Sequence, residues 1–263
     1  MKSIIYIIII IMFPFPALAE TFKDSFDDRN LKGWKQYPEK GIWENRNGAV
    51  DIRIPANDNP QNILDQVHFL TLVSKDYGEY TLSCKVMVHI LEDIDPDKAE
   101  NFIGGLAFRY VDDGGGIRSY FAGISPRGLN HGSCNTNPEA KSTFENSGIV
   151  YSRIGLSFKE DKWYELTIEV HKNSYSVILD NKSYNWDNCV FDDSRVAGFI
   201  SSGGVGLFAA TYPPIFGEVM KAQSVEFLFD DFILAGEGIP GNDTFVGNSK
   251  LPIVWGWVKL RCS

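Results

Sequence analysis

Paired-cysteine motifs are missing from this sequence. The 263 residues include four cysteines, and no two of them form the CxxC pair that many structural zinc sites use. In an exported chain these cysteines allow several disulfide pairings. We favour Cys134 with Cys189, because both lie in polar, loop-like sequence. Cys84 lies inside a strand-like pattern, which suits a buried thiol.

Long apolar segments are also scarce. The longest one, Ile4–Phe15, lies at the N-terminus. Lys2 precedes it, and the A-x-A cleavage pattern Ala17–Ala19 follows it before Glu20. This order is typical of a secretory signal peptide, and the run is short for the alternative, a membrane anchor. We therefore expect residues 1–19 to be removed and the protein to be secreted or periplasmic.

Basic residues are fewer than acidic ones, 25 against 34, which gives a net charge of −9. A surface of this sign repels phosphate backbones and anionic lipids, so it disfavours nucleic acid and membrane partners. A neutral ligand such as a glycan or polysaccharide is compatible with it. Aromatic residues make up 13% of the chain and suit both a packed core and sugar stacking.

Amphipathic helical patterns are absent, and short segments of alternating polar and apolar residues take their place. Glycine, asparagine and aspartate separate these segments, as in Asp112–Gly116. The pattern predicts an all-β, two-sheet antiparallel β-sandwich. The expected strands are Tyr80–Val88, Gly104–Val111, Ser119–Ile124, Trp163–His171, Tyr175–Leu179, Gly204–Ala209 and Val225–Leu234.

Two stretches interrupt the strand pattern. Residues 90–101 are acidic, residues 128–147 are polar, and we expect both to form irregular loops at the rim of the sandwich. One domain is predicted over residues 20–235, followed by a Gly/Pro-rich tail over residues 236–263. The apolar segment 251–260 in that tail carries two tryptophans on one face and is compatible with an added strand.

The order of the motifs resembles the laminin G-like, concanavalin A-like jelly-roll family. The matching motifs are Phe22–Asp28, Gly33–Trp34, Gly41–Trp43, Asn47–Val50, Gly105–Tyr110, Tyr120–Phe121, Lys162–Val170, Gly204–Phe208 and Phe229–Leu234. The resemblance implies two antiparallel sheets with a concave and a convex side. It also implies a lectin-like module, a carbohydrate-binding module, or a glycoside hydrolase or lyase, because this fold does not settle function.

Catalytic motifs are not found. The Glu-x-Asp-x-x-Glu pattern of the related glucanases is missing, and Pro96 interrupts the nearest acidic stretch, Glu92–Asp95. Glu165 and Glu169 share one strand face, where polar residues normally meet water. The favoured function is therefore an exported, lectin-like carbohydrate-binding module without catalysis. The alternatives are a glycan-active hydrolase or lyase and a protein-interaction module, which an apolar patch on the concave sheet would favour.

The hairpin between residues 104 and 124 carries the candidate carbohydrate-binding residues. Alternation puts Phe108 and Tyr110 on the core face and Arg109 on the open face, with Tyr120 as its expected neighbour. Sugar sites need an aromatic ring beside planar hydrogen-bonding groups, which these side chains supply. The alternative is that Tyr120 packs in the core and Arg109 pairs with a surface carboxylate. The other candidates are Arg118, His131 and Trp186.

Calcium is the one cofactor that the sequence suggests, and none is required by the proposed binding. Asp24, Asp230 and Asp231 come from the first and last expected strands, where some modules of the resembled family hold a structural calcium ion. Asp93, Asp95 and Asp97 have ligand-like spacing, but Lys98 stands where the EF-hand loop requires glycine. The first set is therefore the stronger candidate.

Overall fold

The structure is a computed structural model. It describes residues 20–38, 43–54, 67–72, 77–90, 102–112, 114, 116–126, 128–136, 148–184, 189–191, 200–211 and 225–239. The expected signal peptide, the 251–260 segment, Trp186 and the loop carrying Asp93, Asp95 and Asp97 lie outside these residues. No helix among the described residues is long and apolar enough to cross a membrane.

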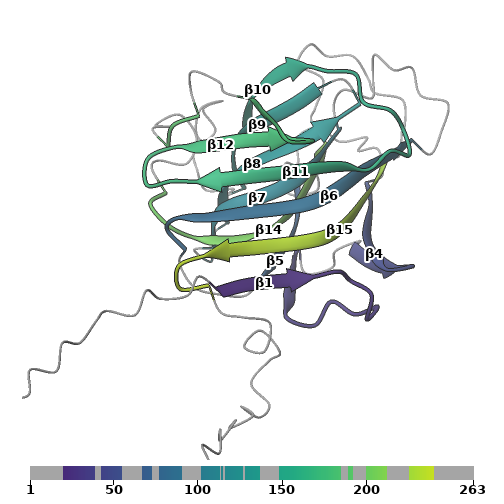
Figure 1. The fold of residues 1–263 in the computed structure, drawn as a ribbon, viewed down its shortest axis with the longest axis horizontal. Coiled ribbons are helices and arrows are strands. Elements are labelled where there is room, and N and C mark those ends of the chain that lie inside the picture. The colour runs from purple at the N-terminus through teal and green to yellow at the C-terminus, as the bar shows by residue number, and fades with distance from the viewer. Residues whose placement is uncertain are drawn as a thin grey trace, which may run out of the picture.

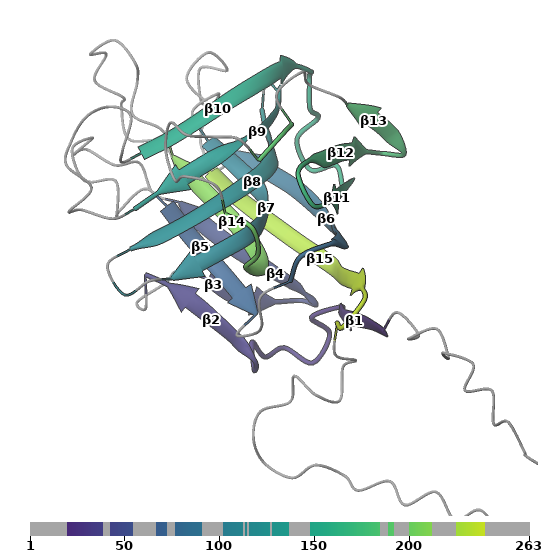
Figure 2. The same ribbon diagram turned by 90° about the vertical axis from the view of Figure 1, so that its left-hand side faces the viewer.

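Two antiparallel sheets form the molecule, and Figures 1 and 2 show them as two layers. Sheet A has the strand order β13-β12-β11-β6-β15-β4-β3, and β1 also pairs with β15. Its strands are β1 (Glu20–Asp24), β3 (Trp43–Arg46), β4 (Ala49–Ile54), β6 (Tyr80–Ile90), β11 (Tyr164–Val170), β12 (Tyr175–Leu179), β13 (Lys182–Tyr184) and β15 (Val225–Gly236).

Sheet B has the strand order β10-β9-β8-β7-β14-β5-β2. Its strands are β2 (Trp34–Tyr37), β5 (Val67–Leu72), β7 (Phe102–Asp112), β8 (Ile117–Ser125), β9 (Gly128–Asn135), β10 (Gly148–Gly155) and β14 (Gly204–Thr211). The described residues contain strands and turns but no helix. The predicted all-β, two-sheet antiparallel sandwich is confirmed, and each expected strand is present to within about two residues at its ends.

One expectation about the loops is wrong. The first part of the polar stretch 128–147 is not irregular, because Gly128–Asn135 forms β9 and pairs with both β8 and β10, while residues 137–147 lie outside the described residues. Glycine, asparagine and serine dominate this strand, so it lacks the apolar alternation by which strands are recognised. Its neighbours on both sides, rather than its own propensity, hold it in the sheet.

The main core lies between the two sheets. In β6, Tyr80, Leu82, Cys84, Val86 and Val88 are buried, while the residues between them are more exposed. This period of two is what a strand with one face on a core requires, and burying each large apolar side chain stabilises the fold by about 1.5–3 kcal/mol. The burial of Cys84 confirms the thiol expected in this strand.

The first strand of the domain pairs with the last, as Figure 1 shows for β1 and β15. Next to this pair, the Trp34 ring of sheet B packs against Phe232 of sheet A with ring centroids 4.9 Å apart. The Trp34 indole N–H also donates a 2.8 Å hydrogen bond to Oδ2 of Asp24. These contacts join the two sheets near the N-terminal edge of the domain.

Candidate functional site

A β-bulge in β7 changes which side chains of the central hairpin face outward. Phe108 pairs with Val205 of β14 but Tyr110 already pairs with Gly204, so Arg109 is the extra residue on β7. Arg109 has a positive φ of 49°, which is uncommon outside glycine. The extra residue shifts the alternation by one position. As a result Arg109 points into the sandwich and Tyr110 takes the outer face.

Arg109 is therefore buried, with no exposed surface, and its expected place on the open face is wrong. Its guanidinium donates hydrogen bonds to three backbone carbonyls, those of Ile200 (2.7 Å), His171 (2.8 Å) and Lys172 (2.9 Å). The charged group also lies 3.4 Å from the centroid of the Phe191 ring. Burial lowers the pKa of Arg109, but a guanidinium remains charged at neutral pH. Arg109 of β7 thus contacts three other segments of the chain, those that contain Ile200, His171–Lys172 and Phe191.

Two further candidates face the same core. Tyr120 is 2% exposed and stacks on Phe108, so the core-packing alternative describes its place correctly. His131 lies in β9 rather than in a loop, and its Nδ1 is 2.6 Å from the Tyr175 hydroxyl. Burial lowers the pKa of His131 to about 4, which keeps the ring neutral at pH 7. Neither side chain is exposed to a ligand. Arg118, at the start of β8, is half-buried.

The two cysteines of the expected disulfide are not joined to each other. Cys189 packs in the core between the sheets, where its Sγ lies 3.9 Å from Nδ1 of His131. Cys134 belongs to the second cluster, on the outer face of sheet B. Because β9 separates the two thiols, a bond between them would need a rearrangement of that sheet. Burial raises the pKa of Cys134, which favours the protonated thiol.

The outer face of sheet B carries a second cluster of buried side chains. Its centre is the stack of Phe121 on Phe208, with ring centroids 4.4 Å apart and planes at 15°. Phe69 lies 5.4 Å from Phe208 and the same distance from Tyr110, while Tyr37 lies 6.3 Å from Phe69. The three phenylalanines are fully buried, and the two tyrosines are half-buried. The outer side of sheet B thus carries a layer of covered phenylalanine rings, with half-buried tyrosines at its edge.

Contacts across sheet B show that this face is curved. The Tyr37 hydroxyl on β2 is 3.4 Å from Oγ1 of Thr136, whose N–H donates to the Ile117 carbonyl of β8. Four strand spacings separate β2 from β8, which in a flat sheet amounts to about 19 Å. A tyrosine side chain cannot span that distance, so the sheet must bend. We call the side that carries Tyr37, Phe69, Tyr110, Phe121 and Phe208 the concave face.

A polar pair stands at the edge of the concave face. The Lys35 ammonium is 3.0 Å from Oδ2 of Asp112, and these side chains are 47% and 31% exposed. Asp112 follows Tyr110 by two positions on β7, so both lie on the same side of the sheet. Lys35 lowers the pKa of Asp112 and keeps its carboxylate charged at neutral pH. Half-buried tyrosine rings beside an exposed ion pair can stack on a sugar ring and hydrogen-bond its hydroxyls.

The aromatic cluster on the outer face of sheet B was not predicted from the sequence, although the sequence contains a signal for it. All six residues of β5 are buried, as are eight consecutive residues of β7. An unbroken apolar run marks a strand that is covered on both faces, in contrast to the alternation of β6. The runs Phe102–Phe108 in β7 and Val205–Ala210 in β14 contain no polar side chain and could therefore have predicted a cluster on the outer side of sheet B.

The three carboxylates expected to hold calcium are not gathered into one site. Asp24 turns toward the inter-sheet side, where its two oxygens accept hydrogen bonds from the Phe26 N–H and the Trp34 indole. Asp231 instead pairs with Lys85, an exposed residue of β6, at 2.5 Å. Asp230 accepts a hydrogen bond from the Asp231 N–H. Among the described residues, a different group brings three metal-ligand side chains together, and it is treated below.

A buried carboxylate stands on the outer side of sheet A. Asp51 of β4 is 4% exposed, and Oδ1 finds no hydrogen-bond partner in the part of the chain that the structure describes. Its Oδ2 lies 3.6 Å from the Arg46 guanidinium. Burial raises the pKa of Asp51 to about 6, and Arg46 offsets only part of that shift. A folded-state pKa above the unfolded value means that the folded protein binds this proton more tightly.

Asp51→Asn should therefore stabilise the protein at pH 7.5 by about 1–3 kcal/mol, because each unit of pKa shift corresponds to about 1.4 kcal/mol. Most of the gain should be lost near pH 4, where Asp51 is protonated in the folded state and nearly half protonated in the unfolded chain. Urea unfolding of both proteins at pH 4 and pH 7.5 measures this difference. Asp28→Asn, at an exposed aspartate, is the control. An equal effect of Asp51→Asn at both pH values would contradict the assignment.

Known structures share this arrangement of sheets. The β-glucanase of Bacillus licheniformis superposes with a TM-score of 0.51 at 7% identity, covering 82% of this chain and 97% of that one. A prokaryotic β-1,3-1,4-glucanase from a mouse hindgut metagenome gives 0.50 at 8% identity, covering 83% and 99%. A family 7 alginate lyase in complex with substrate gives 0.50 at 11% identity, covering 82% and 98%. The fold is thus the concanavalin A-like jelly roll of the glucanases.

Within this class of fold the sequence itself identifies the family. Residues 21–207 match the model of the 3-keto-α-glucoside-1,2-lyase-like domain, so the chain belongs to that family. No curated protein sequence matches the chain. The jelly-roll part of the expected resemblance is confirmed, while its laminin G-like part stays a prediction.

Proposed function

We propose that the protein is exported and binds a carbohydrate on the concave face of sheet B. The observation that carries this proposal is the aromatic layer of that face, edged by the half-buried Tyr37 and Tyr110 and by the exposed Lys35–Asp112 pair. The family description, which names a glucoside, supports a sugar as the ligand. The names of the glucanases and the alginate lyase, proteins of the same fold, agree with it.

The chemistry of the face suits a sugar better than a protein or a nucleic acid. Tyrosine rings offer flat apolar surfaces to the C–H side of a pyranose, while Lys35 donates to hydroxyls and Asp112 accepts from them. The net charge of −9 disfavours polyanions. Because Phe69, Phe121 and Phe208 are fully buried, they support the tyrosines rather than form an exposed apolar patch for a protein partner.

Removing the Lys35–Asp112 pair should weaken glycan binding by about tenfold or more, since hydrogen bonds to charged groups contribute about 1.5–3 kcal/mol. The double variant Lys35→Met, Asp112→Asn keeps the size of both side chains. A glycan array followed by titration with the best soluble hit measures the change. Both residues are partly exposed, so the melting temperature should move little.

A matched control exists on the opposite sheet. Lys85 and Asp231 form an ion pair on the outer side of sheet A with exposed fractions of 48% and 45%. The variant Lys85→Met, Asp231→Asn should leave glycan affinity unchanged. If binding is lost in this control but retained in the Lys35–Asp112 variant, the binding site lies on sheet A and not on the concave face. A glycan array without any hit would contradict the proposal that the protein binds a carbohydrate.

Family membership favours a second candidate, a lyase that acts on a 3-keto-glucoside. A ketone at C3 acidifies the proton on C2, so a carboxylate base can remove that proton while the C1–oxygen bond to the leaving group breaks. The products are the free alcohol and a sugar with a C1–C2 double bond conjugated to the ketone. Asp112 is a partly exposed carboxylate of the concave face and the candidate base.

Incubation with a 3-keto disaccharide separates the two candidates. A lyase should release the second sugar and generate the ultraviolet absorption of a conjugated ketone, and Asp112→Asn should abolish both signals. A binding protein should give saturable binding with no product over the same period.

A further inference from the structure

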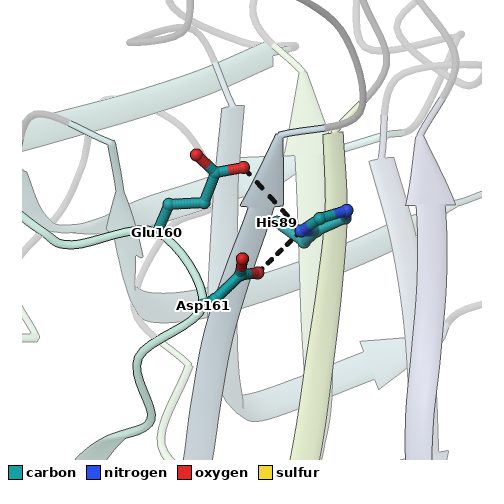
Figure 3. Close-up of side chains that lie close together, drawn as sticks. All are labelled: His89, Glu160 and Asp161. Atoms are coloured by element: carbon teal, nitrogen blue, oxygen red, sulfur yellow. Dashed lines mark hydrogen bonds and ion pairs between the residues drawn. The ribbon is translucent and has the colours of Figure 1, made fainter.

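Three potential metal ligands converge at the end of β6. Figure 3 shows Glu160 and Asp161, from the segment before β11, both pointing toward the His89 ring. The His89 Nδ1 lies 2.6 Å from Oδ1 of Asp161 and 3.7 Å from Oε1 of Glu160. One ligand atom from each side chain lies within 4.8 Å of the others. All three groups remain accessible to solvent, with exposed fractions between 37% and 62%.

The backbone holds the two carboxylates in this position independently of His89. The Ile90 N–H donates a 2.9 Å hydrogen bond to Oε1 of Glu160, and the Asp161 N–H donates to the Val88 carbonyl at 3.1 Å. Asp161 also has a positive φ of 57°, a conformation that aspartate tolerates better than most residues. The ligand atoms are thus brought together by the fold rather than by chance contacts of long, free side chains.

Among the described residues, no lysine or arginine forms an ion pair with Glu160 or Asp161. Within the described residues, the ion-pair partner of both Glu160 and Asp161 is His89. The residue directly across from His89 on β15 is Glu226, which adds a further carboxylate to the same side of sheet A. Two carboxylates and an imidazole nitrogen therefore meet at one point of sheet A, with Lys159 and Lys162 beside the two acids in the sequence and Arg53 across from Glu226. A bound cation would offset the repulsion between the two carboxylates that converge on it.

We propose that His89, Glu160 and Asp161 bind one divalent cation of the zinc and manganese class. One imidazole nitrogen and two carboxylate oxygens form a ligand set that suits these ions, whereas calcium and magnesium prefer oxygen alone. Water would complete the coordination, because the group is exposed. The side chains need only small rotations to admit an ion at about 2.0–2.2 Å from each ligand atom.

The ion would join the end of β6 to the segment that leads into β11. It binds the folded chain, in which residues 72 positions apart meet, and not the unfolded chain. Binding should therefore raise the melting temperature, by about 5–10 °C when the ion is present at about 100 times its dissociation constant. The site is separate from the concave face, because it stands on sheet A.

Titration of the metal-free protein with zinc chloride, followed by calorimetry, tests the proposal. We expect one saturable site per chain and a rise in melting temperature that EDTA reverses. His89→Gln and Asp161→Asn should each weaken zinc binding by about tenfold or more, because each removes one of three ligands. Asn suits the positive φ of Asp161, so the second variant should fold normally. Manganese in place of zinc, followed by electron paramagnetic resonance, gives a second measurement of the same site.

Matched controls keep the test specific. His171→Gln removes another exposed imidazole, and Glu165→Gln removes another exposed carboxylate of sheet A. Both should bind zinc as the unchanged protein does. The proposal fails if no saturable binding appears up to about 1 mM zinc. It fails equally if His89→Gln and Asp161→Asn bind as tightly as the two controls while remaining folded.

Discussion

Replacing Arg109 by alanine should lower the free energy of unfolding by about 3–5 kcal/mol, because buried carbonyls lose their donor and a large buried side chain is removed. The guanidinium donates to the carbonyls of Ile200, His171 and Lys172 inside the sandwich. A buried acceptor that loses its donor costs about 1–3 kcal/mol. The contact with the Phe191 ring is lost as well, and a cavity remains in its place.

Urea unfolding at pH 7.5 measures this loss, and a second substitution identifies its cause. Arg109→Lys keeps the charge but cannot reproduce the fork of hydrogen bonds to three carbonyls, so it should recover only part of the stability. Arg53→Ala, at an exposed position of β4, should change the stability by less than about 0.5 kcal/mol. A change this small for Arg109→Ala would mean that the guanidinium reaches water and that the open-face expectation was right.

The strands of this fold could be predicted from the sequence wherever one face meets the core and the other meets water. β6 and β11 are of this kind, and their alternation gives both the strand and its buried face. β9 could not be found in this way, because its glycine, asparagine and serine residues show no alternation. That strand exists because β8 and β10 pair with it on either side.

The candidate site was harder to predict, because one extra residue reverses a face. Up to Phe108 the alternation in β7 is regular, but the bulge at Arg109 sends Arg109 inward and Tyr110 outward. A bulge depends on what the neighbouring strands and loops offer, here three carbonyls and an aromatic ring for one guanidinium. A local pattern contains none of these partners, so period-two reasoning assigned the two residues to the wrong faces.

Contacts between residues that are distant in the sequence could not be predicted, for similar reasons. His89 and Asp161 are 72 positions apart and share no motif. Tyr37 and Thr136 meet because sheet B curves, which the pattern of any single strand does not reveal. The cysteines illustrate the opposite error, since Cys134 and Cys189 lie in similar polar sequence, yet Cys189 packs in the core between the sheets and Cys134 in the cluster on the outer face of sheet B.

Phe208→Ala should cost about 3–5 kcal/mol of stability, the usual range for removing a buried phenylalanine ring. Phe208 is fully buried between Phe69 and Phe121 although it lies on the outer side of sheet B. A ring that served only as an open platform for a sugar would instead cost affinity and almost no stability. The prediction therefore tests whether the aromatic layer supports the fold as well as the proposed site.

Thermal and urea unfolding of Phe208→Ala, Phe121→Ala and the double variant decide the matter. The two rings stack at 4.4 Å, so the double variant should cost less than the sum of the single ones, by about 0.5–1.5 kcal/mol. Trp163→Ala removes a large ring that is 36% exposed, and it should have a much smaller effect. If Phe208→Ala were as mild as Trp163→Ala while glycan affinity fell, the phenylalanines themselves would form the binding surface. The ligand would then lie deeper on the concave face than the edge formed by Tyr37, Tyr110, Lys35 and Asp112.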